Sequence, residues 1–302
     1  MSEKIEILVI GGNSFVAKSF VNYNKINCNI TLVSRTKSQN TNVIVVEDYN
    51  TISDEVFKNK NVVINCTAIV HQKTKIEDSI YFDVNHKLAI KLANQAKQNG
   101  VKQFIQFSTI AVYGNVEEIN NTTKEKPINA YGKSKLLADI DLKKLISETF
   151  AVTIFRAPLI YGGENPPGNM LRLVKLVEKG FPLPFGNANG TRDFINIKNL
   201  VQYIENVITE NKSGLFLVTD NTAISTKDLV KSIAKILNKK ITLLPLPRLV
   251  LSVLKKLKPE IFDKLFGTLK IEPSKNLSIS TNHTIESGLE DMIQYYLKNK
   301  NS

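Results

Sequence analysis

The sequence has few of the residues that bind metals or form disulfides. Its 302 residues include only two cysteines, Cys28 and Cys66, and three histidines, all widely separated. So few cysteines in a chain of this size favour a reducing compartment. Their spacing relative to the histidines offers no metal-ligand set. We therefore expect no metal site.

Long apolar runs are also missing. No run reaches the roughly 18 residues that a membrane-spanning helix needs. The N-terminus passes from Met1-Ser-Glu-Lys4 straight into the strand-like run Ile5 to Ile10, without the pattern of a signal peptide. Together with the low cysteine content, this predicts a cytoplasmic protein.

Arginine is scarce although the chain is basic. The net charge is +12, but only five of the 40 basic residues are arginines. The lysines are spread along the chain and are not interleaved with aromatics, so nucleic-acid binding is not favoured. An arginine on this lysine background suggests a need for its planar, bidentate donor group. The five are Arg35, Arg156, Arg172, Arg192 and Arg248.

What the chain does contain is an alternation of short apolar runs with longer amphipathic stretches, which predicts a parallel sheet covered on both faces. The predicted strands are 5–10, 29–34, 43–46, 62–66, 101–108 and 152–156, and the clearest helices are 83–99 and 131–149. After Gly162, prolines and glycines interrupt the pattern, and helices are predicted at 226–237 and 284–298. We expect a doubly wound, Rossmann-like α/β fold with a smaller C-terminal lobe.

The turn after the first predicted strand reads Gly11-Gly-Asn13-Ser14-Phe15-Val16-Ala17. In a dinucleotide-binding fold, small residues here let the chain turn tightly and let a pyrophosphate approach a helix N-terminus. Ser14 and Ala17 stand where glycines are usual, so the fingerprint is incomplete. Alone, it is also compatible with a generic turn between a strand and a helix.

The end of the second predicted strand bears on the choice of dinucleotide. An acidic residue there would bind the adenosine ribose of NAD, whereas an arginine accommodates the 2′-phosphate of NADP. The chain has Ser34-Arg35 and no acid at this point. This favours NADP(H) over NAD(H), which stays possible, and the alternative is a solvated surface arginine.

Tyr131-Gly-Lys-Ser-Lys135 follows the pair Ser108-Thr109 by about two dozen residues. Positions i and i+4 share a helix face, so the Lys135 ammonium is expected beside the Tyr131 phenol, whereas Lys133 points away. A fixed cation favours the phenolate and would bring the pKa of Tyr131 toward neutrality. The pattern predicts an acid/base pair, and the alternative is an ordinary exposed helix face.

In this order, the motifs resemble the extended short-chain dehydrogenase/reductase family, which comprises NAD-dependent nucleotide-sugar epimerases, dehydratases and reductases. The resemblance covers nearly the whole chain. It implies a dinucleotide-binding domain at 1–162, with core elements returning from the second half, and a mainly substrate-binding lobe at 163–302. It rests on the Gly11 turn, Asp48, Asn65-Cys-Thr67-Ala68, Asn85, Ser108-Thr-Ile-Ala-Val-Tyr-Gly114, Tyr131-x-x-x-Lys135, Arg156-Ala-Pro-Leu-Ile-Tyr-Gly162 and Arg192-Asp-Phe194.

The resemblance also implies functional residues. Thr109, Tyr131 and Lys135 would be catalytic, and Thr109, Asn169, Arg172 and Arg192 would contact the substrate, with Arg192 clamping its diphosphate. Cofactor contacts are implied for Gly11, Asn13, Ser14, Phe15, Val16, Ser34, Arg35, Asp48, Thr67, Ala68, Asn85, Tyr131, Lys135, Pro158 and Leu159.

Departures from the family pattern narrow the implied reaction. The 4,6-dehydratases carry an acid pair after the threonine, and Ile110 and Ala111 occupy those positions here. Segments of the second half resemble reductases that convert UDP-4-keto-6-deoxy-N-acetylhexosamines to UDP-N-acetylquinovosamine or UDP-N-acetylfucosamine for surface polysaccharides. The expected activity is therefore NADPH-dependent reduction at C4. The alternative is an NAD-dependent UDP-sugar 4-epimerase.

Other interpretations concern partners. A nucleotide-sensing protein of this fold would lack Thr109, Tyr131 or Lys135, and all three are present. The resemblance implies a homodimer formed through the helices at 83–99 and 131–149. The basic, apolar stretch 246–269 could lie in a lipid interface, although such a stretch is also compatible with a helix pair packed on the lobe.

Overall fold

The computed structural model describes residues 4–37, 42–70, 76–277, 279 and 282–300. Its centre is a seven-stranded, wholly parallel sheet in the order β11-β7-β5-β4-β1-β2-β3. The strands are β1 (Ile5–Ile10), β2 (Cys28–Ser34), β3 (Val43–Val45), β4 (Val62–Asn65), β5 (Gln103–Thr109), β7 (Ala151–Ala157) and β11 (Gly214–Leu217).

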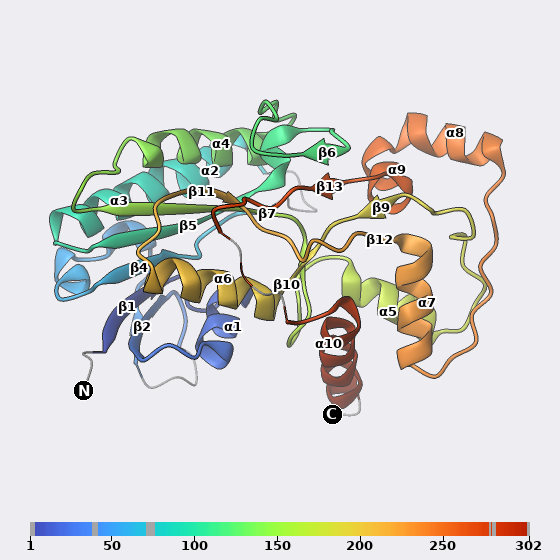
Figure 1. The fold of residues 1–302 in the computed structure, drawn as a ribbon, viewed down its shortest axis with the longest axis horizontal. Helices are drawn as coiled ribbons and strands as arrows, with labels where there is room; N and C mark the ends of the chain where they lie inside the picture. The colour runs from blue at the N-terminus through green and yellow to red at the C-terminus, as the bar shows by residue number, and fades with distance from the viewer. Residues whose placement is uncertain (1–3, 38–41, 71–75, 278, 280–281, 301–302) are drawn as a thin grey trace.

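Helices cover both faces of this sheet (Figure 1). One face packs against α1 (Phe15–Tyr23) and α6 (Ile197–Thr209), whose buried side chains join Ile7 and Val9 of β1 in one core. The other face packs against α3 (Leu88–Gln98) and α4 (Ala130–Lys143) around Leu8 and Ile10. Successive side chains of β1 therefore enter opposite cores, as strand geometry requires. The predicted doubly wound α/β fold is confirmed.

The carboxyl ends of the strands share one edge of the sheet, because all strands run in the same direction. The chain passes from β1 outward to β2 and β3, then returns to place β4 on the other side of β1. In open α/β sheets, ligands bind outside the carboxyl ends of the strands, at such a switch point. The topology thus brings the Gly11 turn and the residues that follow β4, β5 and β7 to one edge.

A smaller lobe has its own core between α5 (Met170–Glu178), α7 (Thr226–Ile236) and α10 (Ile285–Lys300), and the chain returns to the sheet domain between α5 and α7. Three two-stranded pairs connect it to the rest: β8 (Ile160–Tyr161) with β10 (Ile195–Asn196), β9 (Thr191–Arg192) with β12 (Ile224–Ser225), and β6 (Glu118–Ile119) with β13 (Lys270–Ile271). Helices α8 (Arg248–Leu257) and α9 (Pro259–Phe266) lie at its outer edge (Figure 1).

The helices differ from the prediction in several places. The stretch predicted as one helix over 83–99 contains a π-helical turn, Asp83–Lys87, between α2 (Asp78–Phe82) and α3. Helix α4 ends at Lys143, six residues early, because the chain turns back through an antiparallel bridge between Ser147 and Phe150. Helix α6 was not predicted, although Asn196 caps it through the Lys198 amide.

Candidate active site

The turn after β1 has the tight geometry that a phosphate-binding turn needs. Gly11 has φ +88°, and a Cβ there would stand 2.9 Å from the Cys66 carbonyl carbon. The side-chain oxygen of Ser14 accepts a hydrogen bond from the Ala17 amide at 3.2 Å and caps α1. Ser14, which departs from the glycine pattern, thus starts the helix. The amides of Phe15 and Val16, in the first turn of α1, have no acceptor within the helix.

The end of β2 lies against this turn. The Asn13 amide donates to the Thr36 hydroxyl at 2.5 Å, and the Ser34 hydroxyl donates to the Thr36 carbonyl. Arg35 is exposed, with its guanidinium carbon 5.7 Å from the centroid of the Tyr49 ring. One face of this planar group lies toward the Tyr49 ring, and because Arg35 is exposed its guanidinium can meet an anion from solvent.

Asp48 follows β3 and caps a short 3-10 helix, Tyr49–Thr51. Its Oδ1 accepts from the Asn50 amide nitrogen at 2.9 Å and from the Asn50 side chain at 3.1 Å. The carboxylate is exposed. The Asp48 carboxylate contacts Asn50, two residues further along the chain. Its contact with a cofactor therefore stays a prediction.

The loop after β4 is fixed by buried amides. Thr67 donates its hydroxyl to Asn65 Oδ1 at 2.7 Å and is itself buried, whereas Ala68 is exposed. Asn85 is fully buried, and its side chain both donates to the Ile69 carbonyl and accepts from the Ile69 amide, each at 2.9 Å. It also donates to the Ser134 hydroxyl at 3.2 Å. Asn85 therefore holds this loop to α4.

Thr109, Tyr131 and Lys135 meet at the carboxyl end of β5. Thr109 ends the strand, and Tyr131 lies in the first turn of α4, which Asn129 caps through the Gly132 amide at 2.9 Å. The Thr109 side chain lies close enough to the Tyr131 phenol to lower its pKa. Lys135 is 2% exposed, and its Nζ donates to the Phe107 carbonyl at 3.0 Å.

The electrostatics of this group differ from the prediction. Burial raises the pKa of Tyr131, the nearby Thr109 side chain opposes that shift, and the charge of Asp139 adds to it. Lys135 is not among the groups that shift the pKa of Tyr131, and its ammonium donates to the Phe107 carbonyl. Burial lowers the pKa of Lys135 itself to about 8, against the opposing effects of Asp139 and Cys66.

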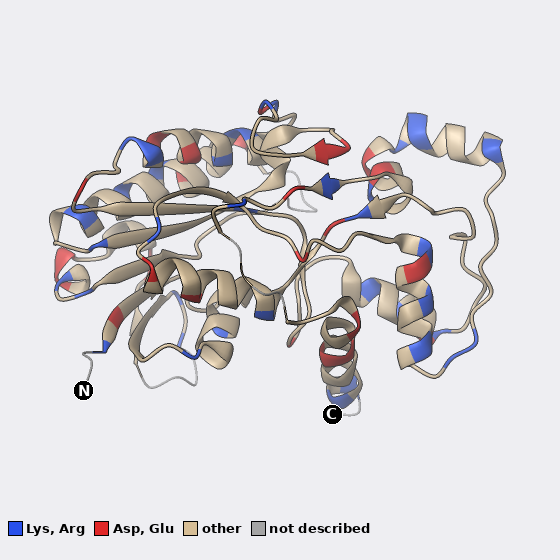
Figure 2. Cartoon of the chain, viewed as in Figure 1, with Lys and Arg blue, Asp and Glu red and all other residues tan. Residues whose placement is uncertain are grey.

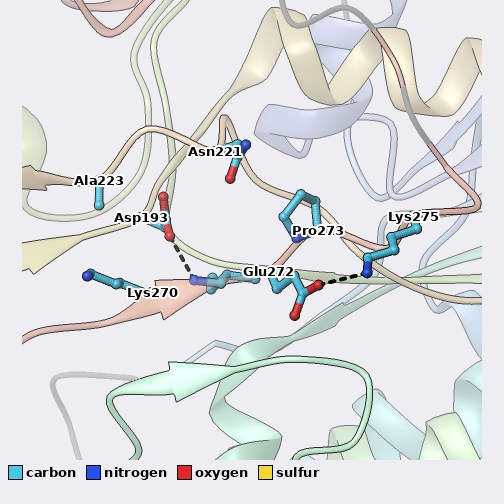
Figure 3. Close-up of a pocket in the computed structure, with 8 residues that line it drawn as sticks. Asp193, Asn221, Ala223, Lys270, Glu272, Pro273 and Lys275 are labelled. Atoms are coloured by element: carbon cyan, nitrogen blue, oxygen red, sulfur yellow. Dashed lines mark hydrogen bonds and ion pairs between the residues drawn. The ribbon is translucent and has the colours of Figure 1, made fainter.

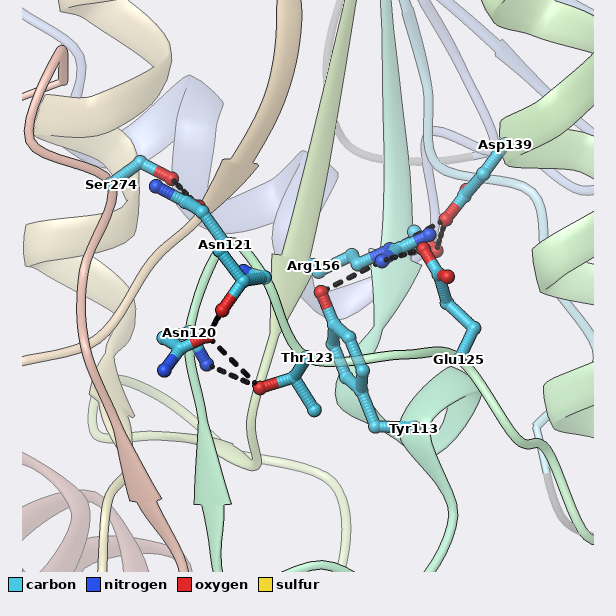
Figure 4. Close-up of polar contacts among 10 residues, drawn as sticks. Tyr113, Asn120, Asn121, Thr123, Glu125, Asp139, Arg156 and Ser274 are labelled. Carbon is cyan, nitrogen blue, oxygen red and sulfur yellow. Dashed lines mark hydrogen bonds and ion pairs between the residues drawn. The ribbon is translucent and has the colours of Figure 1, made fainter.

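An ionic cluster with a buried centre joins β7 to α4 (Figure 4). Arg156 of β7 donates its Nε to Asp139 at 2.9 Å and its Nη1 to the Tyr113 hydroxyl at 2.7 Å and to Glu125 at 2.8 Å. Asp139 is 1% exposed and also accepts from Ser108 at 2.8 Å. Its Oδ1 has no hydrogen-bond partner among the residues with described positions.

Asp139 was not among the predicted site residues. A signal was available, because Asp139 follows Lys135 by four residues and Tyr131 by eight, which places all three on one face of α4. The scarcity of arginine also singled out Arg156. Only the fold, which sets β7 beside β5 and α4, shows that Arg156 reaches Asp139.

The residues predicted to contact the nicotinamide and the substrate differ in how exposed they are. Pro158 is buried after β7, whereas Leu159 is 38% exposed. Asn169 and Arg172 are exposed at the start of α5, with the Arg172 Nη1 3.4 Å from the Asn169 Oδ1. Arg192 is half-buried, and its Nη1 donates to the Asp263 carbonyl of α9 at 2.9 Å.

An open cavity of about 550 Å³ adjoins β13 (Figure 3). There, Asp193 accepts from the Ile271 amide at 2.7 Å, and Glu272 pairs with Lys275 at 3.6 Å. It is lined by Asp193, Asn221, Ala223, Lys270, Ile271, Glu272, Pro273 and Lys275. This set contains none of the predicted site residues, so the cavity is not the predicted site.

Comparison with known proteins gives the following relatives. The profile of the NAD dependent epimerase/dehydratase family matches residues 7–217. The chain is 32% identical over 259 residues to a UDP-glucose 4-epimerase of Vibrio cholerae, covering 81% of this chain and 79% of that protein. It is 26% identical over 251 residues to N-acetyl-alpha-D-glucosaminyl-diphospho-ditrans,octacis-undecaprenol 4-epimerase of Escherichia coli O157:H7, covering 80% and 75%.

Solved structures share the fold. UDP-glucuronic acid 4-epimerase from Bacillus cereus, solved in complex with NAD, superimposes with a TM-score of 0.78 at 19% identity, covering 97% of this chain and 99% of that one. UDP-N-acetylglucosamine 4-epimerase from Methanobrevibacter ruminantium M1, solved with UDP-N-acetylmuramic acid, gives a TM-score of 0.78 at 17% identity and covers 99% and 100%.

Proposed function

The chain belongs to the NAD dependent epimerase/dehydratase family, and on this premise we propose that it is an enzyme that transfers hydride at C4 of a UDP-linked sugar. The observation that carries the proposal is the meeting of Thr109, Tyr131 and Lys135 at the carboxyl edge of the sheet. The names of the relatives support a nucleotide-sugar substrate and chemistry at C4.

The residues around the Gly11 turn fit a nicotinamide dinucleotide. A Cβ at Gly11 would strike the Cys66 backbone. The amides of Phe15 and Val16, which have no acceptor within the helix, suit a pyrophosphate. When bound, the dinucleotide supplies the group that gives or accepts hydride. The residues that would hold it, besides Tyr131 and Lys135, are Gly11, Asn13, Ser14, Phe15, Val16, Ser34, Arg35, Asp48, Thr67, Ala68, Pro158 and Leu159, with Asn85 acting through the loop it positions.

In the reductive direction, C4 of the ketosugar gains hydride and its carbonyl oxygen gains a proton. The Thr109 hydroxyl would donate a hydrogen bond to this oxygen and stabilise its developing negative charge. The Tyr131 phenol would then donate the proton. Its raised pKa keeps the phenol protonated near neutrality, which suits the role of acid. Lys135, whose ammonium donates to the Phe107 carbonyl, would act mainly by holding the dinucleotide.

The substrate diphosphate would be bound by Arg192, with Asn169 and Arg172 near the nucleotide. Arg192 already donates one N–H to the Asp263 carbonyl, and a guanidinium has five. Burial lowers the pKa of Arg192, and the charge of Asp263 opposes this shift. Because water screens charges poorly at a partly buried position, an anion bound there would be attracted strongly to the guanidinium.

Net reduction is the first candidate, with NADPH as the donor. Exposed Arg35 at the end of β2 suits a 2′-phosphate, and Ile110 and Ala111 offer no acid for dehydration. The substrate would be a UDP-4-keto-6-deoxy-N-acetylhexosamine, giving UDP-N-acetylquinovosamine or UDP-N-acetylfucosamine for polysaccharide synthesis. The 4-epimerase names of the relatives favour a second candidate, an NAD-dependent UDP-sugar 4-epimerase.

A homodimer through α3 and α4 is proposed for either reaction. Leu137 and Ile140 of α4, which are 40% and 44% exposed, would be covered by the second copy.

The experiment supplies both candidate reactions in parallel. One sample contains the enzyme, NADPH and UDP-4-keto-6-deoxy-N-acetylglucosamine, and the other contains UDP-glucose or UDP-N-acetylglucosamine without added cofactor. NMR should show a C4 alcohol in the first sample and no C4 inversion in the second. Lys135→Met should abolish product formation, while Lys133→Met, two residues away on the exposed face, should not. Product in neither sample from folded enzyme would reject the proposal.

A further inference from the structure

Helices α8 and α9 carry an apolar stripe that faces solvent. No residue of either helix is buried. Leu249, Val253 and Leu257 recur every four residues along α8, and Val250 lies next to them. Because this spacing keeps side chains on one helix face, the four form a continuous stripe. Their exposed fractions are 76%, 48%, 68% and 45%.

This stripe is separate from the surface that joins the two helices. Leu251 and Leu254 of α8 are only partly exposed, and Phe262 and Phe266 of α9 stack with their ring centroids 5.6 Å apart. Their packing explains why the pair folds together. It does not explain Leu249 and Leu257, which the pairing leaves outside.

Basic side chains surround the stripe. Between positions 248 and 264, the chain has five cationic residues and two anionic ones, Glu260 and Asp263. Lys256 follows Leu249 by seven residues, almost two helical turns, so it lies along the edge of the stripe. Figure 2 shows basic residues along α8 at the outer edge of the lobe. The cations are Arg248, Lys255, Lys256, Lys258 and Lys264.

We propose that α8 and α9 dock this enzyme on a membrane surface rich in anionic phospholipid. The apolar stripe would enter the boundary between headgroups and acyl chains, and the surrounding cations would meet the phosphates. A second copy of the chain fits less well, because two such surfaces would bring like charges together. Docking would be in the plane of the membrane: α8 has ten residues, and no helix in the described part of the chain can span a bilayer.

The docking helices are connected to the proposed substrate site. Arg192 of β9 donates to the Asp263 carbonyl of α9, and Leu269, three residues beyond α9, bridges to Arg192. Docking would therefore fix the segment that is proposed to hold the substrate diphosphate. The docking itself rests on α8 and α9 alone, so it stands or fails separately from the proposed reaction.

The test is co-sedimentation of the full-length protein with vesicles of phosphatidylcholine alone or mixed equally with phosphatidylglycerol. We expect at least tenfold stronger binding to the anionic vesicles, weakening as salt rises from 0.05 to 0.5 M. Lys255→Glu/Lys256→Glu should lower this binding at least tenfold, and Leu249→Asp/Leu257→Asp should abolish it. Lys143→Glu/Lys144→Glu makes the same charge change at the end of α4 and should bind like the wild type.

Folding is checked by the circular dichroism melt of each variant, and association by sedimentation velocity. Equal binding to both vesicle types, absence of binding, or an equal loss in the α4 variant would overturn the proposal. So would a stable oligomer that Leu249→Asp/Leu257→Asp converts to a smaller species, because a second copy would then cover the stripe.

Discussion

Charged residues are treated in opposite ways at α4 and at the α8–α9 pair. At α4, Lys135 and Asp139 are 2% and 1% exposed, and Arg156 joins them from β7 at 2%. At α8 and α9, every basic residue is exposed. A buried charge needs partners within the protein, and the α4 cluster supplies them next to the proposed site. A solvated charge is available to partners outside. The basic residues of the chain therefore serve two purposes: buried ones belong to the α4 cluster, and exposed ones surround the apolar stripe of α8.

The largest effect should come from breaking the buried ion pair. Asp139→Asn removes the charge opposite Arg156, and loss of one partner of a buried pair costs about 3–5 kcal/mol. Urea unfolding measures the change. The exposed control is Lys264→Ala, whose pair with Glu260 spans 3.9 Å and should be worth about 0–1 kcal/mol. Similar losses of unfolding free energy in the two variants would show that the buried ion pair is no more important for stability than the exposed one.

Tyr131→Phe tests whether the α4 region is catalytic as well as structural. The substitution keeps the ring and removes the proton, so kcat should fall by about 10² or more, which corresponds to roughly 2.7 kcal/mol. Dinucleotide binding should be nearly unchanged. Leu257→Ala in α8 should leave turnover of a soluble substrate intact. Near-normal kcat in Tyr131→Phe would remove the phenol from the mechanism.

The pH dependence of the free energy of unfolding, measured without dinucleotide, tests whether Lys135 is buried. Its pKa falls from 10.5 in the unfolded chain to about 8 in the folded one. Between these values the unfolded state binds more protons, so the wild type gains stability as pH rises. Relative to Lys135→Met, the gain from pH 8 to 10.5 should approach about 3 kcal/mol. Lys133→Met, on the exposed face, should show no such difference from the wild type; a flat difference for Lys135→Met would contradict the burial argument.

Arg35 sharpens the comparison, because it is exposed and yet lies in the proposed cofactor site. Arg35→Asp should invert a preference for NADPH over NADH, since a carboxylate repels the 2′-phosphate and accepts from a free 2′-hydroxyl. We expect a change of about tenfold or more in the ratio of the two kcat/KM values, the scale of one charge-assisted hydrogen bond. Equal use of both cofactors by the wild type would argue against NADP(H) specificity.

Much of the fold could be predicted because the buried strands leave a local signal. Ile5–Ile10 was predicted with the bounds that the structure gives, and β-branched runs marked most of the other strands of the sheet. Local pattern also brought Tyr131 and Lys135 to one helix face. It could not show that the Lys135 ammonium would turn to the Phe107 carbonyl, since that contact links positions 28 residues apart.

The sequence left the ionic cluster undetected and the packing of the 246–269 stretch open, for different reasons. Arg156 reaches Asp139, Tyr113 and Glu125 only because β5, β7 and α4 meet in space. The apolar pattern of α8 is visible in the sequence, but a sequence cannot distinguish a stripe that packs from one that stays exposed. The structure separates them through the partly covered Leu254 and the exposed Leu257.

Net delivery of hydride to C4 of a UDP-linked ketosugar is tested most directly by isotope counting. The enzyme is given NADPH deuterated at the transferring position together with UDP-4-keto-6-deoxy-N-acetylglucosamine. The predicted result is about one NADPH oxidised per ketosugar consumed, with the deuterium at C4 of the product. Inversion at C4 of a saturated UDP-sugar, with no net oxidation of cofactor and no deuterium incorporated, would contradict the reductase and favour the epimerase.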